Sequence, residues 1–235
     1  MKWILAALVF AFSHTLNAAT FKIFAAETPP FLEKKGDGVD GLSGLFGTIV
    51  AEKIKKSGKA KEFEVVWVPW KRALHETLKT RNGLFFPLAR SADREKIYAW
   101  LGHLGAVESW FYATDPKIKL ESWNELKKYR IGFLNGSMRD DELHKILGSK
   151  ATNIEGLNED SINYKKLIYG RIDLWTTQTE VFETAERDYK AKNPSSRKVY
   201  AIKKFLDQEV WIASAANMEE KYQEQIRTIF GNTKN

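Results

Sequence analysis

The sequence predicts an α/β protein with two lobes, each a mainly parallel sheet flanked by helices, joined by two hinge strands. Strand-like and helix-like segments alternate between residues 21 and 88, and a second alternating series runs from residue 123 to residue 190. Such alternation is typical of parallel sheets covered by helices. Extended segments, rather than a flexible linker, join the two series. A chain of 235 residues that is 43% hydrophobic can bury the core of such a protein.

The first series is expected to contain three strands and two helices. Residues 21–25 form a strand, and apolar residues at helical spacing predict a helix over residues 42–54. The β-branched and aromatic residues 63–68 form a second strand. Pro69 is well placed to start the next helix, because proline is tolerated at the first helical position. Residues 84–88 form a third, buried strand.

The second series and the connecting segments complete the two lobes. We expect the first lobe to comprise residues 20–108 and 207–235, and the second lobe residues 109–206. Helices are expected at 123–128, 136–147, 161–169, 180–190 and 218–230, and extended segments at 107–113, 129–134, 172–176, 198–202 and 209–213.

The first residues have the layout of a secretory signal peptide. Lys2 precedes an apolar run over residues 3–12, and Ala18 and Ala19 follow a polar stretch. The apolar run is about half of the roughly 20 residues that a membrane span needs. The sequence contains no cysteine to carry a lipid anchor at the cleavage site. We therefore expect residues 1–19 to be removed and the mature protein to be soluble in a bacterial periplasm.

The charge of the chain does not predict a nucleic-acid-binding protein. The formal net charge is +7, but the lysines and arginines are scattered among 30 acidic residues. A nucleic-acid site would require basic residues gathered on one face or along one helix. A solvated surface with a basic bias fits this pattern, and the bias also favours anionic small molecules or a membrane surface.

One stretch, residues 69–96, predicts where such an anion binds. It combines a helix, a tight turn at Asn82-Gly83, a buried apolar strand and a polar loop that carries Arg90 and Arg94. Guanidinium groups bind carboxylates in a bidentate, orientation-specific manner. Two of them at the end of a buried strand indicate a site for an anionic group.

The sequence offers little support for catalysis or for a metal. Glu27, Glu108 and His103 are candidate acids or bases, but no catalytic pairing is recognisable. His75, His103 and His144 lack the spacing of metal ligands. We therefore expect no catalytic residue, no metal and no cofactor.

Several short motifs, taken together and in this order, resemble a known family. They are Pro29-Pro30-Phe31, Val39-Asp40-Gly41-Leu42, Val68-Pro69-Trp70 with Arg72-Ala73-Leu74, Ala89 to Arg94, Ile131-Gly132 with Asn135-Gly136-Ser137, and Gly170-Arg171-Ile172-Asp173. Over essentially its whole mature length the chain is similar to the type II periplasmic solute-binding proteins, the family 3 proteins that serve amino-acid ABC transporters. The resemblance implies the two-lobed, type II periplasmic-binding-protein-like fold.

The resemblance also implies which residues bind the ligand. Arg94 matches the arginine that grips a ligand carboxylate from the first lobe. Ser137 and the amides of Met138 and Arg139 match the loop of the second lobe that meets the same carboxylate, and Trp70 matches an apolar wall. Purely structural roles, as a buried arginine, a helix cap and a core tryptophan, remain open for these residues.

The departures from the family pattern bear on the ligand. Gln178 stands where the family carries the acidic residue that holds the ligand's ammonium group, and Thr28 stands where it carries an aromatic ring. Arg90 stands where a small or polar residue is usual, so a second cation would favour a more anionic ligand such as a dicarboxylate. Glu27 is a candidate replacement for the missing ammonium partner.

The resemblance implies a protein that captures a small carboxylate-bearing ligand, such as an amino acid, between two lobes. We expect it to be a monomer without a cofactor that delivers its ligand to an ABC permease in the inner membrane. Two alternatives remain open on the same fold. One is a sensor module with a degenerate pocket, and the other is a dehydratase-like enzyme.

Overall fold

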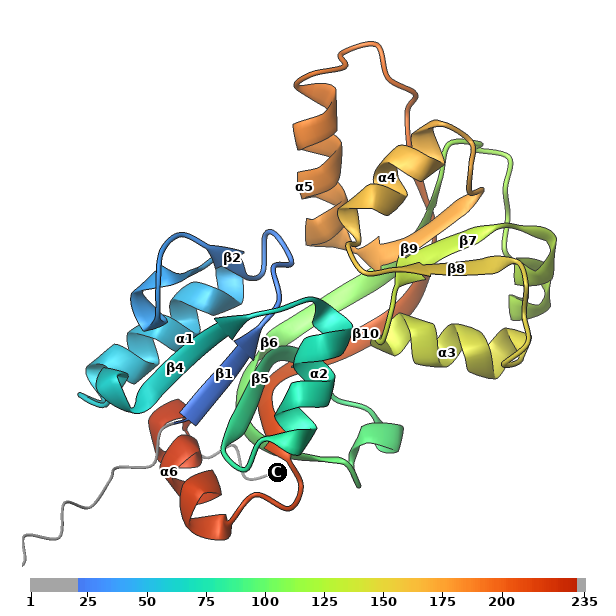
Figure 1. Cartoon of the computed structure of the whole chain (residues 1–235). Coiled ribbons are helices and arrows are strands. Elements are labelled where there is room, and N and C mark those ends of the chain that lie inside the picture. Colours follow the sequence, from blue (N-terminus) through green and yellow to red (C-terminus); the bar gives the residue numbers. More distant parts are fainter. Residues whose placement is uncertain (1–20, 232–235) are drawn as a thin grey trace, which may run out of the picture.

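The computed structural model describes residues 21–231 of the chain. The expected signal peptide at residues 1–19 lies outside the described residues. Two lobes are visible, and two long strands run from one to the other (Figure 1). The structure thus has the α/β, two-lobed architecture that the sequence predicts.

Each lobe contributes three parallel strands. Those of the first lobe are β1 (Phe21–Ala25), β4 (Phe63–Trp67) and β5 (Gly83–Ala89), and those of the second lobe are β7 (Ile131–Leu134), β8 (Ile154–Leu157) and β9 (Leu174–Gln178). Strand β1 lies between β4 and β5, and β7 lies between β8 and β9. The carboxyl ends of these strands therefore lie on one edge in each lobe, which is where ligands bind in parallel α/β sheets.

Helices cover both faces of the sheet in each lobe. Those of the first lobe are α1 (Leu45–Lys56), α2 (Trp70–Lys79) and α6 (Glu220–Phe230), and those of the second lobe are α3 (Met138–Leu147), α4 (Ser161–Ile168) and α5 (Thr179–Lys190). In the first lobe α2 lies on one face, and α1 and α6 lie on the other; in the second lobe α3 lies opposite α4 and α5 (Figure 1).

The alternation of side chains along the strands explains this packing. Phe24 and Phe85 join a buried cluster with residues of α2, whereas Ile23 and Leu84, one position earlier in each strand, join a cluster with residues of α1 and α6. Successive side chains of a strand point to opposite faces, so each apolar strand needs helices on both sides.

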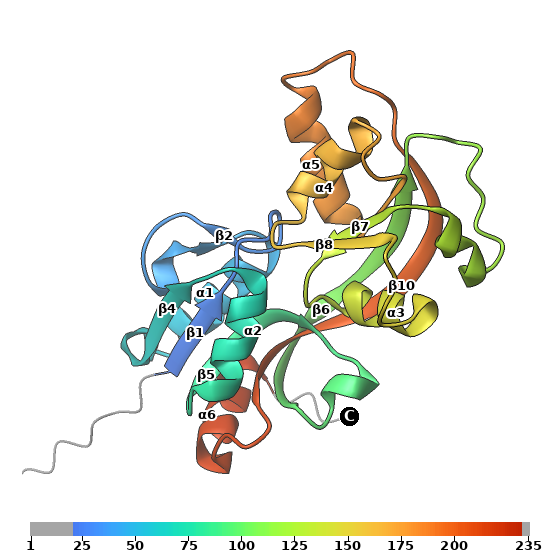
Figure 2. The ribbon, with the colours of Figure 1, turned by 45° about the vertical axis from the view of Figure 1, so that its right-hand side comes forward.

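Two strands of unusual length connect the lobes. Strand β6 (Tyr98–Ala113) and strand β10 (Tyr200–Ala215) are antiparallel to each other and pass through both lobes (Figure 2). They join the other strands into a sheet with the order β4-β1-β5-β10-β6-β9-β7-β8. We expected the chain to cross between the lobes after residue 108 and again before residue 207. Glu108 pairs with Asp207 in this ladder, so these two positions are neighbours on adjacent strands.

Strand β10 corrects one expectation. Residues 198–202 and 209–213 were expected to be separate extended segments, but β10 runs through the charged residues between them. The Lys203 amine donates to the carbonyl oxygen of Leu120 at 2.6 Å, and the Lys204 amine donates to Glu108 at 2.7 Å. The backbone ladder also pairs Lys203 with Phe111 and Leu206 with Ser109, so partners that are distant in sequence hold these residues as strand.

The remaining differences are short elements and helix starts. Strand β8 was not expected, and α1 begins at Leu45 rather than at residue 42. Gly44 precedes α1 with a φ of 86°, and a Cβ there would lie 2.5 Å from the carbonyl oxygen of Pro30. Further short elements are β2 (Glu33–Lys34), β3 (Leu42–Ser43) and the 3₁₀ turns at Val39–Gly41, Ala60–Glu62, Ala92–Arg94 and Trp123–Lys128.

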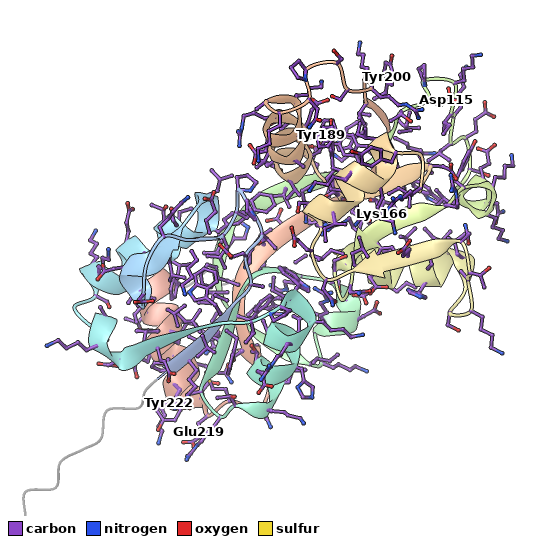
Figure 3. All side chains as sticks on the ribbon, turned by 45° about the horizontal axis from the view of Figure 1, so that its top comes forward. Asp115, Lys166, Tyr189, Tyr200, Glu219 and Tyr222 are labelled. Carbon is purple, nitrogen blue, oxygen red and sulfur yellow. The ribbon has the colours of Figure 1, made fainter. Side chains whose placement is uncertain are left out.

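Aromatic side chains pack within both lobes. Tyr222 on α6 and Tyr189 on α5 lie in different lobes (Figure 3). Tyr222 meets Phe21 edge-on with ring centroids 6.0 Å apart, and the ring centroids of Tyr189 and Tyr164 are 5.5 Å apart.

Among residues 21–231, no helix combines the length and the apolar character that crossing a membrane requires.

Candidate functional site

A cleft of about 950 Å³ lies between the two lobes. One wall consists of the loop after β1, the start of α2 and the loop after β5. The other wall consists of the loop after β7, the start of α4 and one side of α5. Val107, Gln208 and Val210 of the hinge strands also line it. The cleft therefore lies at the carboxyl ends of the parallel strands of both lobes.

Arg94 projects from the first lobe and contacts the second. Its side chain lines the cleft and is 7% exposed. Its Nη1 donates to the carbonyl oxygen of Ala89 at 3.2 Å, and its Nη2 donates to the carbonyl oxygen of Gly136 at 3.1 Å and to Oδ2 of Asp141 at 2.8 Å. Gly136 and Asp141 belong to the second lobe, so this guanidinium bridges the cleft.

Trp70 adds a second contact across the cleft. It is the first residue of α2, directly after Pro69, and its ring packs edge-on against Phe85 with centroids 4.9 Å apart. The Nε1 of Trp70 donates to the carbonyl oxygen of Gly136 at 3.2 Å. Trp70 therefore both joins the core of the first lobe and lines the cleft.

The N-terminus of α3 faces the cleft from the second lobe. Ser137 caps the helix, and its Oγ accepts a hydrogen bond from the Asp140 amide at 3.3 Å. Asp140 in turn accepts a hydrogen bond from the Gly136 amide at 2.7 Å. The amides of Met138 and Arg139 are at the first two helical positions, which have no partner within a helix. Ser137, Met138 and Arg139 all line the cleft, so the helix cap and amides of the kind that can bind an anion lie at the same place.

Arg139 lines the cleft, and its buried side chain makes contacts that the sequence did not predict. It is 1% exposed, and its Nη2 donates to Oδ2 of Asp160 at 2.9 Å. Asp160 also accepts hydrogen bonds from Thr177 Oγ1 and Trp175 Nε1, both at 2.8 Å, and from Asn163 at 3.3 Å. Its carboxylate is therefore saturated by donors of the second lobe.

Most of the Arg139 guanidinium has no such partner. Its Nε and Nη1 make no hydrogen bond to any residue in the part of the chain that the structure describes. Burial lowers the pKa of Arg139, the Asp160 carboxylate raises it, and the nearby positive charge of Arg94 lowers it further. Arg94 and Arg139 both line the cleft.

Arg90 lies outside the cleft, so the expectation that it supplies a second cation to the pocket is wrong. Its guanidinium lies over the rings of Trp100 and Trp211, with centroid distances of 5.6 and 5.0 Å, and its Nε donates to Glu95 at 2.8 Å. The preceding residue, Ala89, ends β5 and lines the cleft. Successive side chains of an extended segment point to opposite faces, which turns Arg90 away.

The remaining expected residues line the cleft. Oε1 of Glu27 accepts a hydrogen bond from the Lys34 amide at 3.0 Å, and the hydroxyl of Thr28 donates to the carbonyl oxygen of Ala26 at 3.4 Å. Gln178 is the residue before α5, and its side chain makes no cap hydrogen bond. The cleft thus carries a neutral amide at residue 178, and Glu27 supplies a carboxylate on the opposite wall.

Sequence reasoning missed several residues of the cleft. The Tyr164 hydroxyl and Oε1 of Gln208 are buried at its lining and make no hydrogen bond to the residues that the structure describes. Asp160 directly precedes α4, and an aspartate before a helix is a recognisable cap signal. No local signal marks Tyr164 or Gln208, because only the packing of the lobes brings them to the cleft.

The candidate acids and bases other than Glu27 do not reach the cleft. Glu108 pairs with Lys204 on the hinge strands, and hydrogen bonds from Lys204 and Trp110 lower its pKa. His103 contacts Glu209, with 2.5 Å between Nε2 and Oε2. Residues 21–231 contain no group of three or more histidine, aspartate or glutamate side chains arranged to hold a metal ion.

Comparison with known proteins identifies the fold. No protein-family model matches the sequence, and no curated protein matches it. The structure of arginine-bound ArgBP from T. maritima matches with a TM-score of 0.68 and 16% identity, covering 90% of this chain and 94% of that one. The arginine-, lysine-, histidine-binding protein ArtJ from Geobacillus stearothermophilus matches with a TM-score of 0.70 and 17% identity, covering 90% and 87%.

A signalling protein has the same fold. A histidine kinase sensor domain with similarity to periplasmic binding proteins matches with a TM-score of 0.72 and 10% identity, covering 90% of this chain and 88% of that one. The chain therefore has the periplasmic-binding-protein-like fold found in amino-acid-binding proteins and in a sensor domain, as the sequence motifs predicted.

Proposed function

We propose that this chain is a periplasmic solute-binding protein that captures a small carboxylate-bearing ligand between its lobes. One observation carries the proposal: Arg94 from the first lobe and the N-terminus of α3 from the second line the same cleft. A guanidinium and free helical amides are complementary to a single carboxylate. The relatives of this fold that bind amino acids support a binding role rather than catalysis.

Capture is coupled to closure of the lobes. A ligand that contacts both walls binds the closed form better than the open form, and so shifts the population toward closure. Arg94 already holds Asp141 and Gly136 of the second lobe. The carboxylate of the ligand therefore replaces that of Asp141 on the guanidinium, and one charge-assisted interaction is exchanged for another.

The proposal extends to the route of the protein and its partner. We infer export through the segment at residues 1–19, release into the periplasm without a lipid anchor, and delivery of the ligand to an inner-membrane ABC permease. The mass of the exported protein tests the first step, because cleavage after Ala18 or Ala19 removes a defined set of residues. A full-length mass in the periplasmic fraction would contradict it.

Thermal unfolding with a panel of small acids tests the binding site. A ligand that binds only the folded state stabilises it by RT ln(1+[L]/Kd), so acids in excess raise the melting temperature. Arg94→Gln removes the guanidinium and is expected to abolish the shift, because losing a buried charge partner costs about 2–5 kcal/mol. Arg90→Gln is the matched control, since it removes a guanidinium outside the cleft and leaves the shift intact. An unchanged shift in Arg94→Gln would contradict the site.

A sensor module is the second candidate function. The histidine kinase sensor domain with this fold favours it, and so does Gln178, which removes the usual ammonium partner. A module with a degenerate pocket binds none of the acids. The absence of any melting shift across the panel, with a correctly folded protein, would therefore favour this candidate over solute capture.

A further inference from the structure

The guanidinium of Arg139 is a buried charged group at the cleft, with donors unpaired in the part of the chain that the structure describes. An arginine has five N–H donors, and the recorded hydrogen bond of this side chain is the one from Nη2 to Asp160. Nε and Nη1 are buried and have no partner among residues 21–231. Leaving a buried charged donor unsatisfied is costly, so a group that binds there gains more than it would at the surface.

Asp160 cannot turn to satisfy these donors. Its two oxygens already accept hydrogen bonds from Arg139 Nη2, Thr177, Trp175 and Asn163. All of these residues belong to the second lobe. The free part of the Arg139 guanidinium is therefore a fixed feature of this wall, whichever position the first lobe takes.

The carboxylates at the cleft accept hydrogen bonds, whereas two lysines at the cleft have no acidic partner among the described residues. Glu27 accepts from the Lys34 amide, Glu159 from the Ser161 hydroxyl, Asp160 from its four donors and Asp188 from Arg187. Lys165 and Lys192 are exposed, line the cleft and pair with no acidic residue in the described part of the chain. Glu27 and Glu159 accept only from neutral groups, so the exposed charges of the cleft have both signs. Within the described residues, the buried charged donors without a partner are Nε and Nη1 of Arg139.

A ligand with one carboxylate satisfies only part of this arrangement. Its carboxylate binds Arg94 and the amides at the start of α3, and Nε and Nη1 of Arg139 stay unpaired. We therefore infer that Arg139 forms a second anion subsite and that the ligands of this cleft are short diacids, with one acid on Arg94 and the other on Arg139. This inference rests on the proposed function of carboxylate capture.

Calorimetric titration with matched pairs of acids tests the second subsite. The probes are succinate, glutarate and adipate, each compared with its own monoamide, so that length and shape stay constant and one negative charge is removed. The full mature chain is expected to bind at least one diacid tenfold or more tightly than its monoamide, which corresponds to about 1.4 kcal/mol.

Two variants attribute this preference to Arg139. Arg139→Lys keeps a cation beside Asp160 but removes the Nε and Nη1 donors, and it is expected to lose the preference. A single substitution in a buried pair can prevent folding. The double variant Arg139→Gln with Asp160→Asn therefore removes both charges at once, and it is also expected to lose the preference for diacids over monoamides. Arg90→Gln retains the full preference. Thermal unfolding without ligand verifies that each variant is folded.

The outcomes separate the two claims. Equal binding of every diacid and its monoamide, or a preference that survives in both Arg139 variants, overturns the second subsite but leaves carboxylate capture intact. Failure of the wild-type protein to bind any of these acids, or unchanged binding in Arg94→Gln, overturns the proposed function itself. Loss of the preference in the Arg139 variants, with retention in Arg90→Gln, supports the inference.

Discussion

The two walls of the cleft hold their arginines in different ways. Arg94 of the first lobe bonds to Gly136 and Asp141 of the second lobe, whereas Arg139 pairs with Asp160 of its own lobe. When the lobes separate, Arg94 loses these partners and Arg139 keeps its own. The first guanidinium therefore responds to closure, and the second is a permanent part of its wall.

The largest expected effect is on the permanent wall. Asp160→Asn leaves the charge of Arg139 buried without a counterion, and breaking a buried pair in this way costs about 3–5 kcal/mol of the free energy of unfolding. Urea unfolding measures the loss. Adding Arg139→Gln to the same chain is expected to restore part of it, because the uncompensated charge is then gone.

Asp188→Asn is the control for that measurement. Asp188 also lines the cleft, but its side chain is 67% exposed and its partner Arg187 is 70% exposed. Surface substitutions of this kind change stability by about 0.5 kcal/mol or less. If Asp160→Asn were as mild as the control, the distinction between a fixed and a closure-dependent arginine would fail.

The second prediction concerns the closure-dependent wall. Asp141→Asn removes the carboxylate that occupies Arg94, so a ligand carboxylate no longer competes with a charge. We expect binding of a monocarboxylate such as propionate to tighten about tenfold, since a charge contact of this kind is worth on the order of 1–2 kcal/mol. Calorimetric titration gives the dissociation constant directly.

Asp93→Asn is matched to that variant. The Asp93 carboxylate forms an ion pair with Lys145 of the second lobe, whereas the Arg94 guanidinium binds Ala89, Gly136 and Asp141. Loss of the Asp93–Lys145 pair weakens the closed form but leaves Asp141 on Arg94, so binding of the monocarboxylate should not tighten. Tighter binding in both variants would mean that the charge balance of the whole cleft, rather than occupation of Arg94, controls affinity.

Local signals explain why part of the site could be predicted from the sequence. Arg94, Trp70 and Ser137 each lie at the boundary of an element, where a proline, a turn or a cap marks the position in the chain. Parallel strands bring such boundaries together at one edge of a sheet. The sequence predicts Arg94 from its place after a buried strand, and the resemblance to the solute-binding proteins implies the roles of Trp70 and Ser137.

The rest of the site depends on contacts between distant segments. The direction of Arg90 is set by Trp100 and Trp211, which belong to two different hinge strands. The direction of Arg139 is set by the rotation of α3 and by Asp160, which lies 21 positions away. Strand β10 was divided in two for the same reason, because the partners of its lysines are on other segments. Tertiary packing determines these features, and short sequence patterns do not encode that packing.

The third prediction changes the charge of the second wall. Gln178 lines the cleft at the start of α5, where the family pattern carries an acidic residue. Gln178→Asp supplies a carboxylate for the ammonium group of a zwitterionic amino acid, and we expect glutamate to gain about tenfold in affinity relative to glutarate, as one partly buried charge pair provides. Titration of both ligands measures the ratio. An unchanged ratio would mean that the ammonium subsite lies elsewhere, with Glu27 as the remaining carboxylate on the first lobe.

The smallest expected effect tests whether burial is what makes the Arg139 pair permanent. Asp173 and Arg130 also form a pair within the second lobe, with 2.7 Å between Nη2 and Oδ1, but their side chains are 32% and 55% exposed. The hydrogen bond from Arg130 lowers the pKa of Asp173 below its ordinary value of 3.8. A carboxyl group with a lowered pKa stabilises the folded state above its unfolded pKa, and this contribution is lost as the pH falls through the folded value.

Urea unfolding of the wild-type protein and of Asp173→Asn at several pH values measures this contribution. After allowance for solvent screening we expect a difference of about 0.5 kcal/mol at pH 7 that disappears as the pH falls well below 3.8. A difference that stays constant with pH would mean that the charge of Asp173 is not what stabilises the strand end. A difference as large as that of Asp160→Asn would mean that pairing within one lobe, rather than burial, separates the two walls.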